Sequence, residues 1–238
     1  MVRMTPGAHA DDLALVVAAA GVGSRYSAAR SKLLESLDGE PVFLHCLRRL
    51  GAVVPPERTV LVIHPQAREA FAAALQALPG AAALRLVSGG ATRAESVARG
   101  LDALPPGLTY VAVQDAARPL TTADLLRRCL ESARLWGSGV AARRVTDTIK
   151  ITDGQGAVVA TPDRDRLWAA ETPQVFRIDD LRRACQAARQ SGLCPTDEAA
   201  AVEALGLPVR LVESRTPNPK VTQPADLAVI EALARRPA

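Results

Sequence analysis

Aromatic side chains are scarce in this sequence, since Phe, Tyr and Trp together make up 3% of its 238 residues. Proteins that hold single-stranded nucleic acid use aromatic rings as stacking platforms. The arginines are also spread over many segments instead of forming one basic stripe. We therefore expect no nucleic-acid partner, although the formal net charge is +4.

Cysteine is also rare, and nothing about its spacing indicates a disulfide framework or a zinc site. The four cysteines lie far apart, with no CxxC pair, at Cys46, Cys129, Cys185 and Cys194. A chain of this size with isolated cysteines is typical of a reducing compartment. We expect a cytoplasmic protein.

The sequence has no apolar run of the roughly 20 residues that a membrane-spanning helix needs. The apolar stretch near the N-terminus, Leu13 to Ala20, directly follows Asp11 and Asp12, whereas a secretory segment would be preceded by basic or neutral residues. We interpret it as a buried strand and expect no membrane partner.

Short apolar runs alternate with helical patterns along most of the chain, which predicts an α/β fold with a mostly parallel sheet. The chain can bury a full core, and no long linker divides it, so we expect one domain over residues 1–238. The expected strands are 13–20, 58–63, 83–87, 109–113, 139–142 and 209–212. The expected helices are 41–50, 67–78, 92–104, 121–135, 178–190, 196–205 and 224–234.

One segment, Val145 to Val159, breaks this alternation. Its apolar residues alternate on both sides of an Asp-Gly-Gln-Gly turn, the pattern of a β-hairpin. A lone hairpin is only marginally stable in water. We therefore predict a projecting β-arm over about 145–161 that grips a second subunit in a homodimer.

Ligands of open parallel sheets bind at the carboxyl ends of the strands, so we looked for polar clusters there. The first expected strand leads into Gly21-Val22-Gly23-Ser24-Arg25, and Lys32 ends the loop. Glycines let backbone amides approach a phosphate, which the two cations would neutralise. The loop matches neither a P-loop nor a dinucleotide fingerprint, and an ordinary strand-to-helix turn explains it about as well.

The other clusters also have structural explanations. Thr92 and Glu95 form a capping box, although this explains neither Gly89-Gly90 nor Arg93, which opposes the helix dipole. Asp115 and Arg118 could simply pair with each other, and Thr196 is more readily explained as a helix N-cap than as a ligand contact.

Lysine is much rarer than arginine in this sequence, because only Lys32, Lys150 and Lys220 occur among 29 basic residues. Lys32 and Lys220 both follow expected strands at one edge of the sheet. Compact ammonium groups suit phosphoryl or nucleotidyl transfer, where negative charge builds up in the transition state. The three histidines, in contrast, lie in unrelated segments and form no set with Ser or Cys.

Seven motifs in order make the sequence resemble the 2-C-methyl-D-erythritol 4-phosphate cytidylyltransferase family. They are AAAGVGSRYSAARSK, GGATRAESV, QDAARPL, DTIK, DRDRLWAAETPQVF, TDEAAAVEALG and NPKVTQPADL, spread from about Leu13 to Leu233. The resemblance implies a Rossmann-like nucleotidyltransferase (GT-A-like) fold and a homodimer that exchanges β-arms. It also implies Mg²⁺-dependent transfer of CMP from CTP to methylerythritol phosphate.

The same resemblance implies roles for individual residues. The catalytic cations would be Arg25, Lys32, Arg164 and Lys220. CTP would contact Ala19, Ala20, Gly21, Gly23, Lys32, Gly90, Ser96, Asp115, Ala116 and Lys220. The acceptor would contact Asp115, Arg118, Thr148, Arg164, Thr172 and Thr196. The Mg²⁺ ion, or another divalent cation in its place, would be held through the CTP phosphates, with Asp115 as a candidate ligand.

Several positions depart from the pattern usual in this family, among them Gln114, Glu171 and Pro219. None of them removes a charged position with an implied catalytic role. Two alternatives stay open: a cytidylyltransferase for ribitol 5-phosphate or another sugar phosphate, and a nucleotide-binding relative without turnover. The motifs end near the C-terminus, so we expect the form with a single activity instead of a fused bifunctional one.

Overall fold

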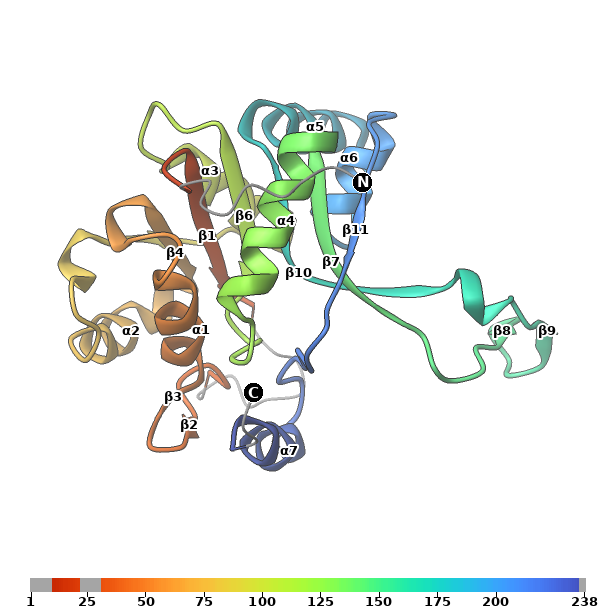
Figure 1. Cartoon of the computed structure of the whole chain (residues 1–238), viewed down its shortest axis with the longest axis horizontal. Helices are drawn as coiled ribbons and strands as arrows, with labels where there is room; N and C mark the ends of the chain where they lie inside the picture. Colours follow the sequence, from red (N-terminus) through yellow and green to blue (C-terminus); the bar gives the residue numbers. More distant parts are fainter. Residues whose placement is uncertain (1–9, 22–30, 236–238) are drawn as a thin grey trace.

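The computed structural model describes residues 10–21 and 31–235. Its centre is a seven-stranded sheet with the strand order β11-β7-β10-β6-β1-β4-β5 (Figure 1). The strands are β1 (Leu13–Ala19), β4 (Thr59–Ile63), β5 (Arg85–Ser88), β6 (Tyr110–Asp115), β7 (Ser138–Arg144), β10 (Trp168–Arg177) and β11 (Leu211–Glu213). All neighbours pair in parallel except β10, which is antiparallel to both β6 and β7. The predicted mostly parallel α/β sheet is confirmed.

Helices cover both faces of this sheet. The helices are α1 (Val42–Gly51), α2 (Arg68–Leu75), α3 (Arg93–Asp102), α4 (Ala123–Trp136), α5 (Ile178–Ser191), α6 (Glu198–Ala204) and α7 (Ala225–Ala234). Buried side chains of α1, α2 and α4 form one core, to which α7 adds Ile230, and those of α3, α5 and α6 form the other. Each expected helix is present, and α2 ends earlier than its pattern predicts.

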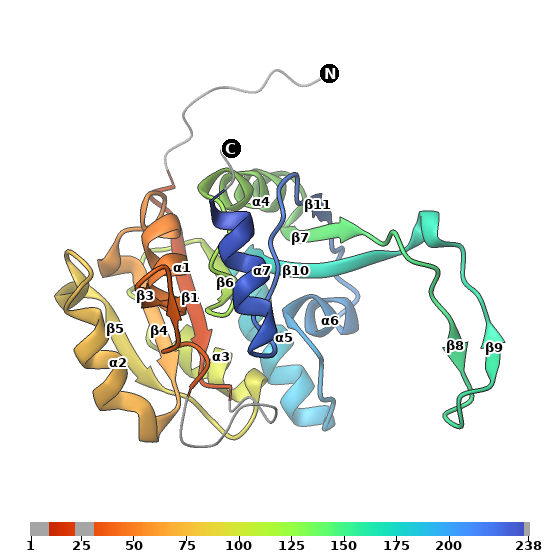
Figure 2. The ribbon, with the colours of Figure 1, turned by 90° about the horizontal axis from the view of Figure 1, so that it is seen from below.

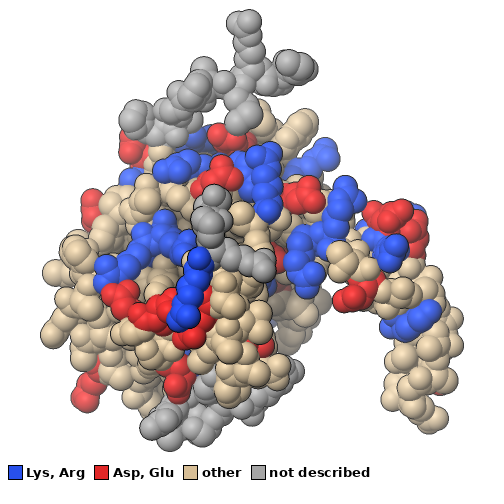
Figure 3. Space-filling model, turned by 60° about the horizontal axis from the view of Figure 1, so that its bottom comes forward, with Lys and Arg blue, Asp and Glu red and all other residues tan. Residues whose placement is uncertain are grey.

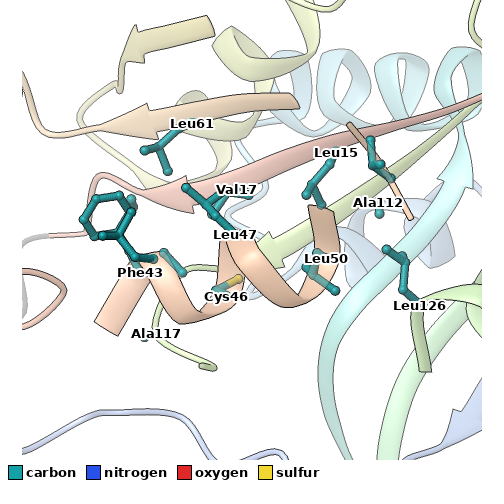
Figure 4. Close-up of a cluster of buried hydrophobic side chains, with 14 of the residues drawn as sticks. Leu15, Val17, Phe43, Cys46, Leu47, Leu50, Leu61, Ala112, Ala117 and Leu126 are labelled. Carbon is teal, nitrogen blue, oxygen red and sulfur yellow. The ribbon is translucent and has the colours of Figure 1, made fainter. Parts of the chain in front are cut away.

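Strand β1 lies in the middle of both cores, which explains its continuous apolar sequence. Successive side chains of a strand point to opposite faces. Leu15 and Val17 accordingly pack on the α1 side, where Figure 4 shows Val17 beside Leu47 and Leu15 towards Leu50, and Val16 packs in the other core. Burial on both faces is typical of a central parallel strand, and it places the end of β1 in the interior.

The sequence analysis missed β10, which lies in the middle of the sheet. Its residues include Glu171, Thr172 and Pro173, and a proline argues against a central strand because it cannot donate to the ladder. The structure accommodates this proline at a register shift between Ala170 and Gln174, where pairing with β7 is interrupted. Glu171, Thr172 and Gln174 are all buried.

Two local predictions at the site were wrong by small shifts. Gln114 and Asp115 are the last two residues of β6 instead of following it, because both pair with β1. Thr196 does not cap α6: the N-cap is Asp197, whose carboxylate accepts a hydrogen bond from the Ala200 amide at 2.9 Å. Aspartate and threonine are both good N-caps, and the sequence alone did not distinguish these neighbours.

The predicted arm is present, and the projecting segment runs from the end of β7 to the start of β10, over residues 145–167, clear of the main sheet (Figures 1 and 2). It carries the small antiparallel pair β8 (Ile151–Thr152) and β9 (Val158–Ala160). The connecting turn is ordered by Asp153, whose Oδ1 accepts hydrogen bonds from two backbone amides. Gly154 and Gly156 have φ angles of 87° and 98° there, which glycine adopts readily.

Two further features complete the fold. The short strands β2 (Ser36–Leu37) and β3 (Glu40–Pro41), which the sequence analysis did not foresee, form a tight hairpin before α1. Within residues 10–21 and 31–235, no helix has the length and hydropathy needed to cross a membrane.

Candidate active site

A cavity of about 480 Å³ opens at the carboxyl ends of β1, β4 and β6, beside the N-terminus of α3. This is where open α/β sheets bind their ligands. The cavity is lined by Ala18, Ala19, Ala20, Gly21, Lys32, Leu33, His64, Gly90, Ala91, Thr92, Arg93, Ser96, Asp115, Ala117 and Lys220. The structure therefore brings together most of the residues expected to bind CTP, from segments far apart in the sequence.

Asp115 is at the centre of the charges in this cavity. Its Oδ2 accepts a hydrogen bond from Lys220 Nζ at 2.8 Å, and its Oδ1 lies 3.3 Å from Arg93 Nη2. Burial opposes ionisation of this carboxyl, but Lys220, Arg93 and Arg118 outweigh that cost and hold its pKa below the ordinary value. Asp115 is therefore a carboxylate at neutral pH.

Lys32 lines the cavity together with Lys220. Its Nζ donates a hydrogen bond to the carbonyl oxygen of Val221 at 2.7 Å, and the Val221 amide donates to the Ala117 carbonyl at 2.8 Å. Lys32 and Lys220 thus approach the same space from the two ends of the chain, which confirms that they share one edge of the sheet.

The charge of the described cavity lining is positive. Lys32, Arg93 and Lys220 are its cations, and Asp115 is its one carboxylate among the described residues. On the face of the molecule that Figure 3 shows, basic and acidic side chains are intermingled. A cavity with this excess of cations suits an anionic ligand such as a triphosphate.

The glycine pair before α3 has a packing explanation that the sequence did not reveal. A Cβ on Gly89 would lie 2.4 Å from the Cβ of Ala20, and one on Gly90 would lie 2.5 Å from that of Glu95. Ser96 is buried, and its hydroxyl accepts a hydrogen bond from the Gly90 amide at 3.1 Å. The glycines therefore let this loop press against β1 and form the cavity wall.

The capping box before α3 is present in modified form. The Thr92 hydroxyl accepts a hydrogen bond from the Glu95 amide at 3.1 Å, while the Glu95 carboxylate accepts from the Ala91 amide at 2.8 Å. In the standard box the glutamate reaches the amide of the cap residue itself. In this variant the glutamate binds the amide of the residue before the cap, Ala91, and so holds Ala91 beside the cavity.

Arg93 has protein partners that explain its unfavourable place in the first turn of α3. Its Nη1 lies 2.6 Å from Oε1 of Glu198, the first residue of α6, and its Nη2 faces Asp115. Burial raises the pKa of Glu198, although Arg93 opposes this shift. The attraction of these two carboxylates offsets the unfavourable interaction between the Arg93 charge and the dipole of α3.

Arg118 and Thr172 lie behind the cavity and contact Asp115 from the β10 side. The Thr172 hydroxyl accepts a hydrogen bond from the Asp115 amide at 3.0 Å. Arg118 Nε lies 3.8 Å from Asp115 Oδ2 and is buried, with no hydrogen-bond partner among the described residues. This Nε therefore faces Asp115 without reaching hydrogen-bond distance, and burial lowers the pKa of Arg118.

The structure does not bring every predicted site residue to the cavity. Thr148 and Arg164 are exposed on the arm, where Arg164 Nη1 donates to the Thr146 carbonyl at 3.2 Å. Thr196 is exposed before α6, and Ala116 is fully buried, whereas its neighbour Ala117 lines the cavity.

Two other predicted residues, Gly23 and Arg25, lie outside the described residues.

Sequence reasoning missed His64, Arg93 and Glu198 as site residues. His64 lines the cavity after β4, and its Nδ1 accepts a hydrogen bond from the Gln66 amide, so the proton of the neutral ring is on Nε2. The only sequence signal was its place directly after a buried strand. For Arg93 the signal was its conflict with the helix dipole, and for Glu198 its place in the first turn of α6.

The residues present fit a Mg²⁺ ion that is bound mainly by its substrate. Asp115 supplies the single carboxylate of the described lining, and no group of three potential metal ligands exists within the described residues. Mg²⁺ commonly binds through one or two carboxylates together with phosphates and water. Any such ion would therefore take most of its ligands from a bound triphosphate.

Comparison with known proteins gives consistent matches over nearly the whole chain. The model of the 2-C-methyl-D-erythritol 4-phosphate cytidylyltransferase family matches residues 13–236. Enzymes of that name from Synechococcus sp. (strain WH7803) and Prochlorococcus marinus (strain MIT 9313) are 41% and 42% identical. Each alignment covers 92% of this chain, together with 97% and 96% of the relative.

Solved structures give the same result. The protein in the crystal structure of 2-C-methyl-D-erythritol 4-phosphate cytidylyltransferase from Thermus thermophilus is 32% identical in sequence to this chain. The two structures align with a TM-score of 0.76, and the alignment covers 94% of this chain and 100% of that one. The 4-diphosphocytidyl-2C-methyl-D-erythritol synthase from Anaerococcus prevotii is 25% identical, with a TM-score of 0.83, covering 95% and 100%.

Proposed function

The chain belongs to the 2-C-methyl-D-erythritol 4-phosphate cytidylyltransferase family, and we propose that it transfers CMP from CTP to 2-C-methyl-D-erythritol 4-phosphate. The products are 4-diphosphocytidyl-2-C-methyl-D-erythritol and pyrophosphate, and the reaction serves isoprenoid precursor biosynthesis. The observation that carries this proposal is the convergence of Lys32, Arg93 and Lys220 on one cavity around Asp115.

The reaction requires alignment and cations more than a protein nucleophile. An oxygen of the acceptor phosphate attacks the α-phosphorus of CTP, the bond from that phosphorus to the bridging oxygen breaks, and pyrophosphate leaves with the bonding electrons. Lys32 and Lys220 stabilise the charge that develops on the phosphate oxygens. The Asp115 carboxylate holds Lys220 in place through their 2.8 Å hydrogen bond.

We propose Mg²⁺ as the cofactor, held by the CTP phosphates with Asp115 as the candidate protein ligand. When bound, the ion would neutralise phosphate charge and orient the triphosphate. The protein cations in the cavity would act on the same phosphates from other sides.

The assembly we propose is a homodimer in which each arm reaches the partner subunit. Ile151, Val158 and Val159 are between 50% and 61% exposed on the arm, which is unfavourable for an isolated chain. The arm also carries Thr148 and Arg164, which are exposed and not among the residues lining their own cavity. Exchange of arms would bring these two residues to the acceptor site of the partner. The four cysteines are free, so we propose the cytoplasm as the location.

Acceptor identity is the part of this proposal that most needs a test. We would measure pyrophosphate release from CTP and Mg²⁺ with methylerythritol 4-phosphate, with ribitol 5-phosphate and with no acceptor, and identify products by mass spectrometry. We expect release and a diphosphocytidyl product with the first acceptor only. Release with ribitol 5-phosphate alone would assign a different acceptor, and no release with any would favour a nucleotide-binding protein without turnover.

A further inference from the structure

Glu171 is a buried carboxylate that the reaction described above does not use. It lies in β10 with 4% of its surface exposed, behind the cavity and not among the residues that line it. Burying an acidic side chain is costly unless it is paired and hydrogen-bonded. The partners of Glu171 therefore indicate what the residue does.

Each oxygen of this carboxylate faces a different set of partners. Oε2 accepts hydrogen bonds from the Ser214 hydroxyl at 2.8 Å and the Asn218 amide at 3.1 Å. Oε1 lies 3.5 Å from Arg143 Nε and 3.9 Å from Arg118 Nη1. One side chain thus ties together the segments that follow β6 and β11 and the end of β7.

Two of these connections lead to the cavity and meet at Asp115. Arg118 lies between two carboxylates, with its Nε 3.8 Å from Asp115 and its Nη1 on the Glu171 side. Asn218 precedes Lys220 by two residues, and its carbonyl oxygen accepts a hydrogen bond from Arg118 Nη1 at 2.6 Å. Glu171 thereby limits the positions of both Arg118 and the segment that carries Lys220.

The network also requires a hydrogen-bond acceptor at both terminal atoms of the side chain at position 171. The orientation of the Asn218 amide is fixed, because its Nδ2 donates to the Thr172 carbonyl at 2.8 Å and its Oδ1 accepts from the Thr121 hydroxyl at 2.8 Å. A glutamine at 171 would place its own NH₂ group against either Asn218 Nδ2 or the two arginines, all of which only donate. A carboxylate satisfies both sides.

We propose that Glu171 is a positioning residue for acceptor binding, acting through Arg118 and the 214–220 segment. The proposal rests on the cytidylyltransferase function proposed above. Without the negative charge at 171, Asp115 is the one carboxylate left within 4 Å of Arg118 among the described residues, so Arg118 competes with Lys220 for it. The loops of residues 18–21 and 89–96 form the nucleotide side of the cavity, and this side meets the network at Asp115 through Arg93.

The test is Glu171→Gln, which preserves size and removes the charge. We expect KM for methylerythritol 4-phosphate to rise about 10-fold or more, and by a larger factor than Kd for CTP, because Lys220 is also expected to contact CTP, while CTP binds with unchanged stoichiometry. The matched control is Glu213→Gln, an exposed carboxylate 3.8 Å from Arg144, which should behave as the unsubstituted protein. Ser214→Ala removes one hydrogen bond to Oε2 and should raise the acceptor KM a few-fold even if Glu171→Gln does not fold.

The outcomes separate the possible failures. An unchanged acceptor KM in Glu171→Gln, or in Ser214→Ala if the first variant does not fold, would overturn the positioning role. A loss of CTP stoichiometry or thermal stability at unchanged KM would show a purely structural role, which also overturns it. If the unsubstituted protein releases no pyrophosphate with any acceptor, the proposed function fails first, and this inference falls with it.

Discussion

At the scale of single residues, the site is built from charges that only work in combination. Arg93 connects Asp115 to the buried Glu198, and Lys220 holds the other oxygen of Asp115. Each of these groups would be unfavourable alone, because burial of an unpaired charge costs several kcal/mol. The consequence is a set of cations, held by ion pairs, in the lining of a cavity suited to an anion.

We predict that Arg93→Met destabilises the protein because it leaves Glu198 buried without its cation. We expect a loss of about 3 kcal/mol in the free energy of unfolding near pH 7, since removing one partner of a buried pair costs about 3–5 kcal/mol and Arg93 is partly exposed. Urea denaturation measures this loss. Arg68→Met, at an exposed arginine, is the matched control and should change stability little.

The same variant should have a characteristic pH dependence. In the folded variant the pKa of Glu198 is raised by burial with no Arg93 to oppose it, so the folded state binds a proton that the unfolded state has lost. Stability should therefore fall as pH rises from the usual glutamate pKa towards neutrality, and the deficit relative to the unsubstituted protein should be smaller at about pH 5 than at about pH 7. A deficit equal at both would contradict the burial of an ionisable Glu198.

At the scale of elements, close contacts between backbone segments fix how the sheet and helices fit. Strand β7 packs against α4 so closely that a Cβ on Gly139 would lie 2.0 Å from the carbonyl oxygen of Cys129. A backbone atom cannot move aside as a flexible side chain can. This contact therefore fixes the position of β7 relative to α4. It also fixes the point from which the arm projects at the end of β7.

We predict that Gly139→Ala lowers the free energy of unfolding by about 3 kcal/mol or more, because overpacking against backbone forces the strand or helix to shift. Gly51→Ala is the control, since a Cβ added to Gly51, the last residue of α1, would meet no atom within 4 Å. Alanine there should instead raise stability by about 0.5–1 kcal/mol. Equal effects of the two substitutions, measured by urea denaturation, would contradict the close approach of β7 to α4.

The elements also show what could be predicted from the sequence and what could not. Strand β1 and the arm were predicted well, because continuous apolar residues and a Gly-containing turn are local signals. Strand β10 was missed because its Glu171, Thr172 and Pro173 are buried by contacts with distant segments, which no local pattern encodes. For the same reason the pairing of Arg93 with Glu198, 105 positions away, could not be foreseen.

At the scale of the whole molecule, the cavity and the arm are separate features of one chain. The cavity collects Lys32, Arg93 and Lys220, whereas Thr148 and Arg164 lie on the arm. Of the predicted acceptor residues, Asp115 lines the cavity, Arg118 and Thr172 lie behind it and Thr196 lies before α6, so the set is divided among separate regions. A homodimer that exchanges arms would complete each site with residues from both subunits.

We predict that Val159→Asp on the arm shifts the protein from dimer to monomer, because it places a charge in the apolar surface we assign to the interface. Val159 is 61% exposed in the single chain, so the substitution should leave the fold of the subunit intact. Sedimentation velocity measures the assembly, and Gln155→Asp in the arm's turn is the control. A variant that stays dimeric would contradict the assignment of the arm as the interface.

The most direct test of the account is the single-turnover rate of CMP transfer in Lys32→Ala at saturating CTP and methylerythritol 4-phosphate. We predict a fall of about 100-fold or more, since removing one group that stabilises transition-state charge costs about 3 kcal/mol. Transfer by Lys32→Ala within a few-fold of the unsubstituted rate would show that the chemistry does not take place in this cavity.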